Sequence, residues 1–255
     1  MHTKLPPVAV VTLTGFEDIF RQFWAGVLRY EPAARVIVVR SRGVDLSSEY
    51  CPHCRQYWPQ PDWEFIDGIE PFVFARNANI GIRAAGSADV FLVNDDVSWT
   101  RAGALDMLQQ VAYRDSKIAV LSPQFIGGVG NRLQSRRIAF DGLRYSTERL
   151  CFTGVYLKRE ALDDIGLLDE RFDGYGSEDD DWCYRARRAG WRLAVTSEAI
   201  FRHGREGLNA SVSFARTMGD TRKSAEEMHQ RFLEKHEQEI YRPGTCPTNP
   251  VLRAL

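Results

Sequence analysis

The first part of the chain alternates between short apolar runs and a segment with a helical repeat of apolar residues. Val8–Leu13 and Val36–Val39 are short and rich in β-branched residues, which is typical of buried strands. Between them, apolar residues recur at helical spacing from Ile19 to Leu28. The order strand, helix, strand favours a parallel sheet with helices packed against its faces, so the sequence predicts an α/β fold.

Similar patterns continue along the chain. They predict further strands and helices: strands at Asp89–Val93, Ile118–Leu121 and Phe152–Leu157, and helices at Ile80–Ala85, Ala102–Ala112, Arg159–Ile165 and Glu178–Ala189. Ser41–Trp63 has no clean period and is interpreted as a long loop. Gly127–Gly130 is interpreted as a flexible turn, because it lacks the Lys-Ser/Thr ending of a phosphate-binding loop.

The chain length is compatible with one large core and an appended segment. At 255 residues we expect a single domain over residues 1–215. Residues 216–255 are polar and charged, and we expect a C-terminal helical extension near Ala225–Glu239 followed by a loose tail.

Composition narrows the class of protein. Hydrophobic residues at 44% and charged residues at 26% are ordinary for a globular protein and argue against wholesale disorder. The net charge of −1 predicts no global attraction to nucleic acid or to anionic lipid. The apolar runs are too short to cross a bilayer and no signal-peptide pattern is evident, so a cytoplasmic location is expected.

The cysteines do not suggest a disulfide framework. There are five, at irregular spacing, and we expect reduced thiols. Cys51 and Cys54 have the spacing of a zinc-binding pair but lack two obvious further ligands, so structural zinc and a redox or chance pair both stay open. His2, His229 and His236 are interpreted as ordinary surface residues.

Two acidic clusters carry the candidate chemistry. Asp95 and Asp96 follow a predicted buried strand directly, at the sheet edge where α/β proteins bind ligands. Adjacent carboxylates repel each other unless a cation or hydrogen-bond donors compensate, and hard divalent cations suit such oxygen ligands. The second cluster, residues 178–181, starts a predicted helix, where acids are favoured by the helix dipole in any case. Each cluster alone is equally compatible with a turn or a helix cap.

Two regions resemble the inverting family 2 glycosyltransferases of the GT-A fold. The first is the Asn-x-Gly of Asn79 and Gly81, which leads through a strand into Asn94-Asp95-Asp96 and is similar to the family's Asp-x-Asp metal motif. The second runs from Phe152-Thr153-Gly154 to Gly190-Trp191 and includes Glu178-Asp179. Together they cover about half of the chain. The resemblance implies a Rossmann-like, mixed but mostly parallel sheet flanked by helices.

The resemblance also assigns roles to individual residues. It implies that Asp96 binds Mn²⁺ or Mg²⁺ and that His203 completes the metal site, as in some family members, although an ordinary hydrogen-bonded histidine is an equal alternative. It implies that Asp179 is the general base, with Glu178 as the alternative. Trp182 is expected either in the acceptor site or in the core. Contacts to the nucleotide-sugar are implied for Thr14, Asn79, Gly81, Asn94, Asp95, Thr153 and Gly154.

The implied activity is inverting transfer of a sugar from a UDP, GDP or dTDP donor to an acceptor hydroxyl. Asn94 replaces the usual first acid of the metal motif, and the strand ending at Arg40 lacks the family's base-reading aspartate, which leaves the donor base open. The acceptor is also open among a glycan, a lipid-linked sugar, a protein, a small molecule and a modified nucleic acid. Ser41–Trp63 and the chain after Arg202 are the expected acceptor-binding regions. Two alternatives are a sugar nucleotidyltransferase and a catalytically inactive nucleotide-sugar-binding module.

Overall fold

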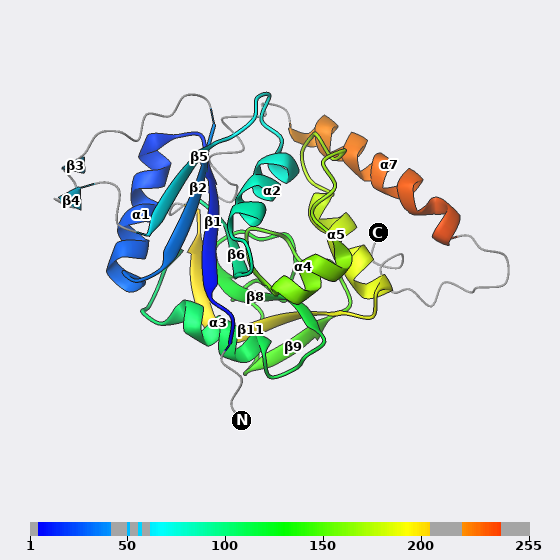
Figure 1. Ribbon diagram of the computed structural model, residues 1–255. Coiled ribbons are helices and arrows are strands. Elements are labelled where there is room, and N and C mark those ends of the chain that lie inside the picture. Colours follow the sequence, from blue (N-terminus) through cyan, green and yellow to red (C-terminus); the bar gives the residue numbers. More distant parts are fainter. Residues whose placement is uncertain (1–4, 42–49, 52–55, 58–61, 205–220, 241–255) are drawn as a thin grey trace.

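The computed structural model describes residues 5–41, 50–51, 56–57, 62–204 and 221–240. Its centre is a 9-stranded mixed sheet with the order β5-β2-β1-β6-β10-β8-β11-β7, in which β9 pairs with β11 (Figure 1). The main strands are β1 (Val8–Thr14), β2 (Arg35–Arg40), β5 (Trp63–Asp67), β6 (Asp89–Asn94), β7 (Val97–Trp99), β8 (Ile118–Ile126), β9 (Leu143–Ser146), β10 (Gly154–Leu157) and β11 (Arg192–His203). A separate pair is formed by β3 (Tyr50–Cys51) and β4 (Gln56–Tyr57).

Most strands of the large sheet share one direction. Strands β5, β2, β1 and β6 are mutually parallel, β10 is antiparallel to both β6 and β8, and β11 is parallel to β8. Only β7, β9 and β10 therefore run the other way among the described strands of this sheet. The carboxyl ends of the majority strands and the start of β10 meet at one edge, which confirms the expected mixed, mostly parallel α/β fold.

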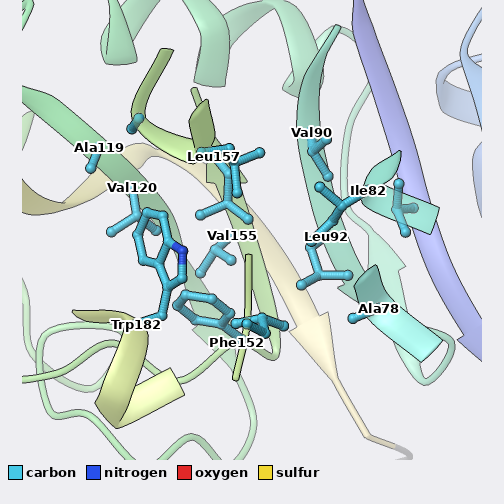
Figure 2. Packing of buried hydrophobic residues seen from close by; sticks show 14 of the residues in the cluster. Ala78, Ile82, Val90, Leu92, Ala119, Val120, Phe152, Val155, Leu157 and Trp182 are labelled. Carbon is cyan, nitrogen blue, oxygen red and sulfur yellow. The ribbon is translucent and has the colours of Figure 1, made fainter. Parts of the chain in front are cut away.

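Helices cover both faces of the sheet. They are α1 (Glu17–Tyr30), α2 (Phe74–Ala84), α3 (Ala104–Ala112), α4 (Arg159–Ile165), α5 (Glu178–Arg188) and α7 (Thr221–Ile240). One apolar cluster lies between the sheet and α1 and α3, and another lies between the sheet and α2, α4 and α5. Figure 2 shows the second cluster, where Trp182 of α5 lies beside Phe152. Trp182 is fully buried and donates a hydrogen bond to the Gly166 carbonyl, so of its two expected places it occupies the core.

Helix α7 packs along α5 (Figure 1). Met228 and Phe232 of α7 are buried against Phe172 and Tyr184 in a small third apolar cluster. The interpretation of His236 as a surface residue is wrong: it is 5% exposed, because its ring packs against Tyr184 and its Nε2 lies 2.8 Å from an oxygen of Asp181.

Several short elements differ from the expectation. β5, β7 and β9 were not expected, because strands of three to five residues leave too little sequence for a period to show. Trp63 begins β5, so the segment interpreted as a loop ends in a strand of the sheet. Cys54 and the expected loose tail after Arg242 lie outside the described residues. Among the helices that the structure describes, none is both long and apolar enough to span a bilayer.

Candidate active site

A cavity of about 830 Å³ lies at the sheet edge where the majority strands end. Its walls come from segments far apart in the sequence. Asn94 ends β6, His203 ends β11, Thr153 precedes β10, and residues 128–130 follow β8. Further walls come from the loop before β10, from the start of α5 and the loop before it, from α7 and from Phe74 of α2. In open α/β sheets this edge is where ligands bind.

The short strand β7 brings Asp96 to His203. The chain turns at Asp95 and Asp96, and β7 then runs antiparallel to β11 with Val97 paired to His203. The Gly204 amide donates a hydrogen bond of 3.0 Å to the Asp96 carbonyl, which fixes the two ends against each other. The imidazole Nε2 of His203 lies 3.5 Å from Asp96 Oδ1, and both side chains are buried.

The Asp96–His203 pair offers bare ligand atoms. His203 Nδ1 is hydrogen-bonded to the Gly128 carbonyl, which can only accept, so in the neutral ring the proton lies on Nδ1 and the lone pair of Nε2 is left for a ligand. Both Asp96 oxygens and His203 Nε2 are buried without a hydrogen-bond partner within the described part of the chain. Unsatisfied buried polar atoms are costly, and a cation would remove that cost. The donor set therefore fits a divalent metal.

Two protein ligands are few for a closed metal site. No group of three or more His, Cys, Asp and Glu side chains that could hold a metal occurs among the described residues. Ions such as Mg²⁺ are commonly bound through one or two carboxylates, with substrate phosphates and water filling the other positions. An Asp–His pair facing a ligand cavity matches this open type of site better than a structural metal site.

The start of α5 places a second group of acids at the cavity. Ser177 has a φ of 72°, a left-handed conformation that is uncommon outside glycine and clusters at functional sites. Glu178, Asp179 and Asp180 follow it and line the cavity. Asp179 accepts hydrogen bonds from the Asp180 amide at 2.8 Å and the Phe152 amide at 3.4 Å.

The acids of α5 have different titration behaviour. Burial, and then the charge of Asp180, raise the pKa of Asp179 to about 7. Burial and the charge of Asp179 raise the pKa of Glu178 well above its usual value. Arg149 opposes these effects, because its guanidinium lies 2.9 Å from each Asp180 oxygen. Perturbed carboxyl groups in a cleft are typical of catalytic sites.

Tyr175 links the two acidic groups. Its side chain lines the cavity, and burial followed by the charges of Glu178, Cys151, Asp179 and Asp96 raises its pKa. Tyr175 and Asp179 line the same cavity as His203, whose Nε2 lies 3.5 Å from Asp96 Oδ1.

No family model matches the chain, and no curated protein matches it. Two solved structures resemble it over nearly its whole length. The structure of GalNAc-T7 with UDP, GalNAc and Mn²⁺ has a TM-score of 0.64 and 12% identity, covering 96% of this chain and 53% of that one. The structure of TarS from S. aureus has a TM-score of 0.56 and 15% identity, covering 90% and 43%. Both are GT-A-fold glycosyltransferases.

The chain has the GT-A fold. It spans about half the length of either similar chain, 53% and 43%. The mixed sheet, with its ligand cavity at the carboxyl ends of β6 and β11, is thus a GT-A sheet, as the sequence resemblance implied.

The GT-A cavity contains only some of the residues that the sequence singled out. Asn94, Thr153, Glu178, Asp179 and His203 line it. Asp95 and Asp96 directly follow Asn94, and Asp96 lies 3.5 Å from His203. Gly154 begins β10 directly after Thr153, and an added Cβ there would lie 3.0 Å from the Phe125 ring.

Three expected nucleotide-sugar contacts lie elsewhere in the GT-A fold. The Asn79 side chain is 1% exposed and is bonded to the Leu168 backbone and to Glu170, so it ties α2 to the loop before α5. A Cβ on Gly81 would lie 2.4 Å from Val11, so this glycine allows α2 to pack closely on β1. Thr14 is buried at the end of β1. None of the three lines the described cavity.

Other cavity residues were missed by the sequence analysis. Gly127–Gly130, interpreted from the sequence as a flexible turn, positions His203. The Gly128 carbonyl accepts a hydrogen bond from the His203 ring, and a Cβ on Gly127 would lie 2.2 Å from the His203 carbonyl oxygen. Arg149 lies in a loop that has no period or motif. His229 lines the cavity rather than an open surface. For the cavity residues of α7, the sequence does contain one signal: Arg222, Ala225 and His229 have helical spacing, which places them on one helix face.

Proposed function

We propose that this protein is an inverting, metal-assisted glycosyltransferase that moves a sugar from a nucleoside-diphosphate sugar to an acceptor hydroxyl. One observation carries the proposal: a single cavity is lined both by His203, whose Nε2 lies 3.5 Å from Asp96, and by Asp179, whose pKa is raised to about 7. Sugar transfer needs both a site for the leaving diphosphate and a base for the acceptor.

Asp96 and His203 would hold Mn²⁺ or Mg²⁺ on the donor side of the cavity. When bound, the ion neutralises the charge that develops on the leaving nucleoside diphosphate. Asn94 and Thr153 lie beside this pair, at the border between β6 and β10, and can donate hydrogen bonds to the donor. GalNAc-T7 was solved with UDP and Mn²⁺, which makes UDP-sugars and Mn²⁺ the first choice for testing.

Asp179 is the proposed base. Its carboxylate takes the proton from the acceptor hydroxyl as that oxygen forms a bond to the anomeric carbon. The bond from this carbon to the diphosphate oxygen breaks on the opposite face, and the anomeric configuration is inverted. A base with a pKa near the working pH is the most effective. Glu178 is the alternative, because it lines the same cavity and burial and the charge of Asp179 raise its pKa as well.

Product analysis tests this proposal against its alternatives. The protein is incubated with Mn²⁺ and a panel of UDP-, GDP- and dTDP-sugars with neutral glycoside acceptors, and the products are followed by proton NMR. We expect a nucleoside diphosphate and a glycoside of inverted anomeric configuration. Release of pyrophosphate in a parallel incubation with a sugar phosphate and a nucleoside triphosphate would indicate a nucleotidyltransferase. Tight donor binding without turnover of any donor would indicate an inactive binding module.

A further inference from the structure

One face of α7 forms a wall of the cavity. Arg222, Ala225, Glu226 and His229 line it, and their spacing of three and four residues places them on a single helix face. The adjacent face of the helix is docked through the buried Met228 and Phe232. The wall therefore has a fixed orientation toward the cavity.

Specific contacts hold α7 to the segment that carries the proposed base. The Ser224 hydroxyl accepts a hydrogen bond of 2.9 Å from the Tyr175 amide, just before α5. Lys235 and His236 contact Asp181, two residues after Asp179 on α5. Lys235 also lies 2.7 Å from Asp169. Helix α7 is thus attached to both the loop and the helix that position Asp179, on the side of the cavity formed by α5 and not by β6 and β11.

The charges around Asp179 favour a neutral ligand. Asp180 is paired with Arg149, and Glu226 lies 3.4 Å from Arg222 on the exposed part of α7. Among the described residues that line the cavity, the acids (Glu178, Asp179, Asp180 and Glu226) outnumber the arginines (Arg149 and Arg222). A phosphate or carboxylate near Asp179 would be repelled, whereas sugar hydroxyls can bond to carboxylates, arginine and imidazole. The Tyr175 ring adds the apolar surface that ligand pockets usually contain.

We infer that the α7 wall, through Glu226 and His229, binds the acceptor of the proposed transfer, and that this acceptor is a neutral saccharide. The inference rests on the proposed function. Glu226 and His229 bind the acceptor's non-reacting hydroxyls and leave the reacting hydroxyl to Asp179. The donor does not contact them, because its proposed site lies at Asn94, Asp96 and His203.

Matched variants on the same helix test the inference. Glu226→Gln and His229→Ala change the cavity face of α7. Their controls are Glu227→Gln and Gln230→Ala, which change the exposed residue that follows each of them in the sequence. Each protein is assayed for Mn²⁺-dependent donor hydrolysis in water, and for transfer to a panel of neutral methyl glycosides and to glycerol phosphate. We expect the KM for the glycoside to rise about tenfold in the two cavity-face variants, with the KM for the donor and its hydrolysis unchanged; a factor of ten corresponds to about 1.4 kcal/mol.

The outcomes separate this inference from the proposed function. An unchanged glycoside KM in both cavity-face variants would overturn it, as would an equal change in Glu227→Gln and Gln230→Ala. Transfer to glycerol phosphate in preference to every neutral glycoside would contradict a neutral saccharide as the acceptor. The same conclusion would follow if the wild type hydrolysed the donor but used no glycoside. Absence of donor hydrolysis and of transfer in the wild type would instead contradict the proposed function.

Discussion

Asp179 combines two properties that a general base needs. It lines the cavity, and its pKa of about 7 comes from burial and from the adjacent Asp180 charge, partly offset by Arg149. The backbone amides of Phe152 and Asp180 hold its oxygens in place. A carboxylate in open water would be ionised at neutral pH but would be a weaker base.

The pH dependence of turnover should report this environment. We expect kcat/KM to fall as the pH drops below about 7, because protonated Asp179 cannot accept the acceptor proton. Asp180→Asn removes a charge that raises the pKa of Asp179, so the acid limb should move to lower pH. Arg149→Met removes a charge that lowers it, so the limb should move to higher pH. Identical pH profiles in wild type and both variants would contradict the role of Asp179.

The Asp96–His203 pair should determine metal affinity. We expect Mn²⁺ to raise the melting temperature of the wild type, because ligands of the folded state stabilise it. His203→Ala removes one of two protein ligands, and the Mn²⁺ concentration needed for half of the shift should rise about tenfold or more. His229→Ala is the matched control, since its imidazole lies on the α7 wall. The same Mn²⁺ response in His203→Ala and wild type would exclude His203 as a ligand.

The loop after β8 depends on one glycine. Gly127 has a φ of 117°, and an added Cβ would lie 2.2 Å from the His203 carbonyl oxygen. We expect Gly127→Ala to lower the free energy of unfolding by about 3 kcal/mol or more, through backbone strain and overpacking together. Gly142→Ala, at a φ of 71° with open space around it, should cost about 1 kcal/mol through backbone strain alone. Equal losses in urea unfolding would show that the close approach to His203 is unimportant.

Helix α7 is held by a buried carboxylate. Burial alone would raise the pKa of Asp181, but hydrogen bonds from His236 and Lys235 and the charge of Arg185 lower it. The ionised Asp181 therefore stabilises the folded state at any pH above the usual aspartate pKa. This contribution to the free energy of unfolding is lost as the pH falls through the lowered pKa of Asp181.

Removal of this carboxylate should destabilise the fold. We expect Asp181→Asn to lower the free energy of unfolding at pH 7 by about 3–5 kcal/mol, because the half-buried Arg185 and Lys235 lose the charge of a fully buried partner. Glu234→Gln changes an exposed acid on α7 and should cost less than about 0.5 kcal/mol. Urea unfolding measures both. A loss for Asp181→Asn no larger than that of the control would show that the network contributes little.

The long elements could be predicted from the sequence because each has a full period of apolar residues. Helix α1 buries five residues at helical spacing, from Ile19 to Val27, and its expected position is confirmed. β7 could not be predicted, since Val97–Trp99 is too short to show alternation. This matters for the site, because β7 is the strand that turns Asp96 back to His203.

The acids of the site carried a sequence signal, whereas their partners did not. Asp96 follows a buried strand and Asp179 starts a helix, so motif and position both pointed to them. Arg149 pairs with Asp180 from 31 residues away, and Gly128 contributes a backbone carbonyl that no side-chain motif encodes. Asn79 and Gly81 match the family motif, but they support the packing of α2 rather than line the cavity.

At the scale of the whole molecule, the cavity lies where the strand direction within the sheet changes. The parallel strands β5, β2, β1 and β6 meet the antiparallel β10 there, and the Asn94 amide donates a hydrogen bond of 2.9 Å to the Thr153 carbonyl across this border. Ligands of open α/β sheets bind at such points. The proposed donor site then lies on the sheet, and the proposed acceptor site lies between the sheet and α7.

Nucleoside diphosphate release from a UDP-sugar, measured with and without Mn²⁺, tests most directly whether Asp96 and Asp179 serve one transfer reaction. We expect release by the wild type to require Mn²⁺, and to fall about 100-fold or more in both Asp96→Ala and Asp179→Asn. Asp163→Asn, at an exposed acid of α4, should keep the wild-type rate. Undiminished, Mn²⁺-independent release by Asp96→Ala and Asp179→Asn would contradict the proposed site.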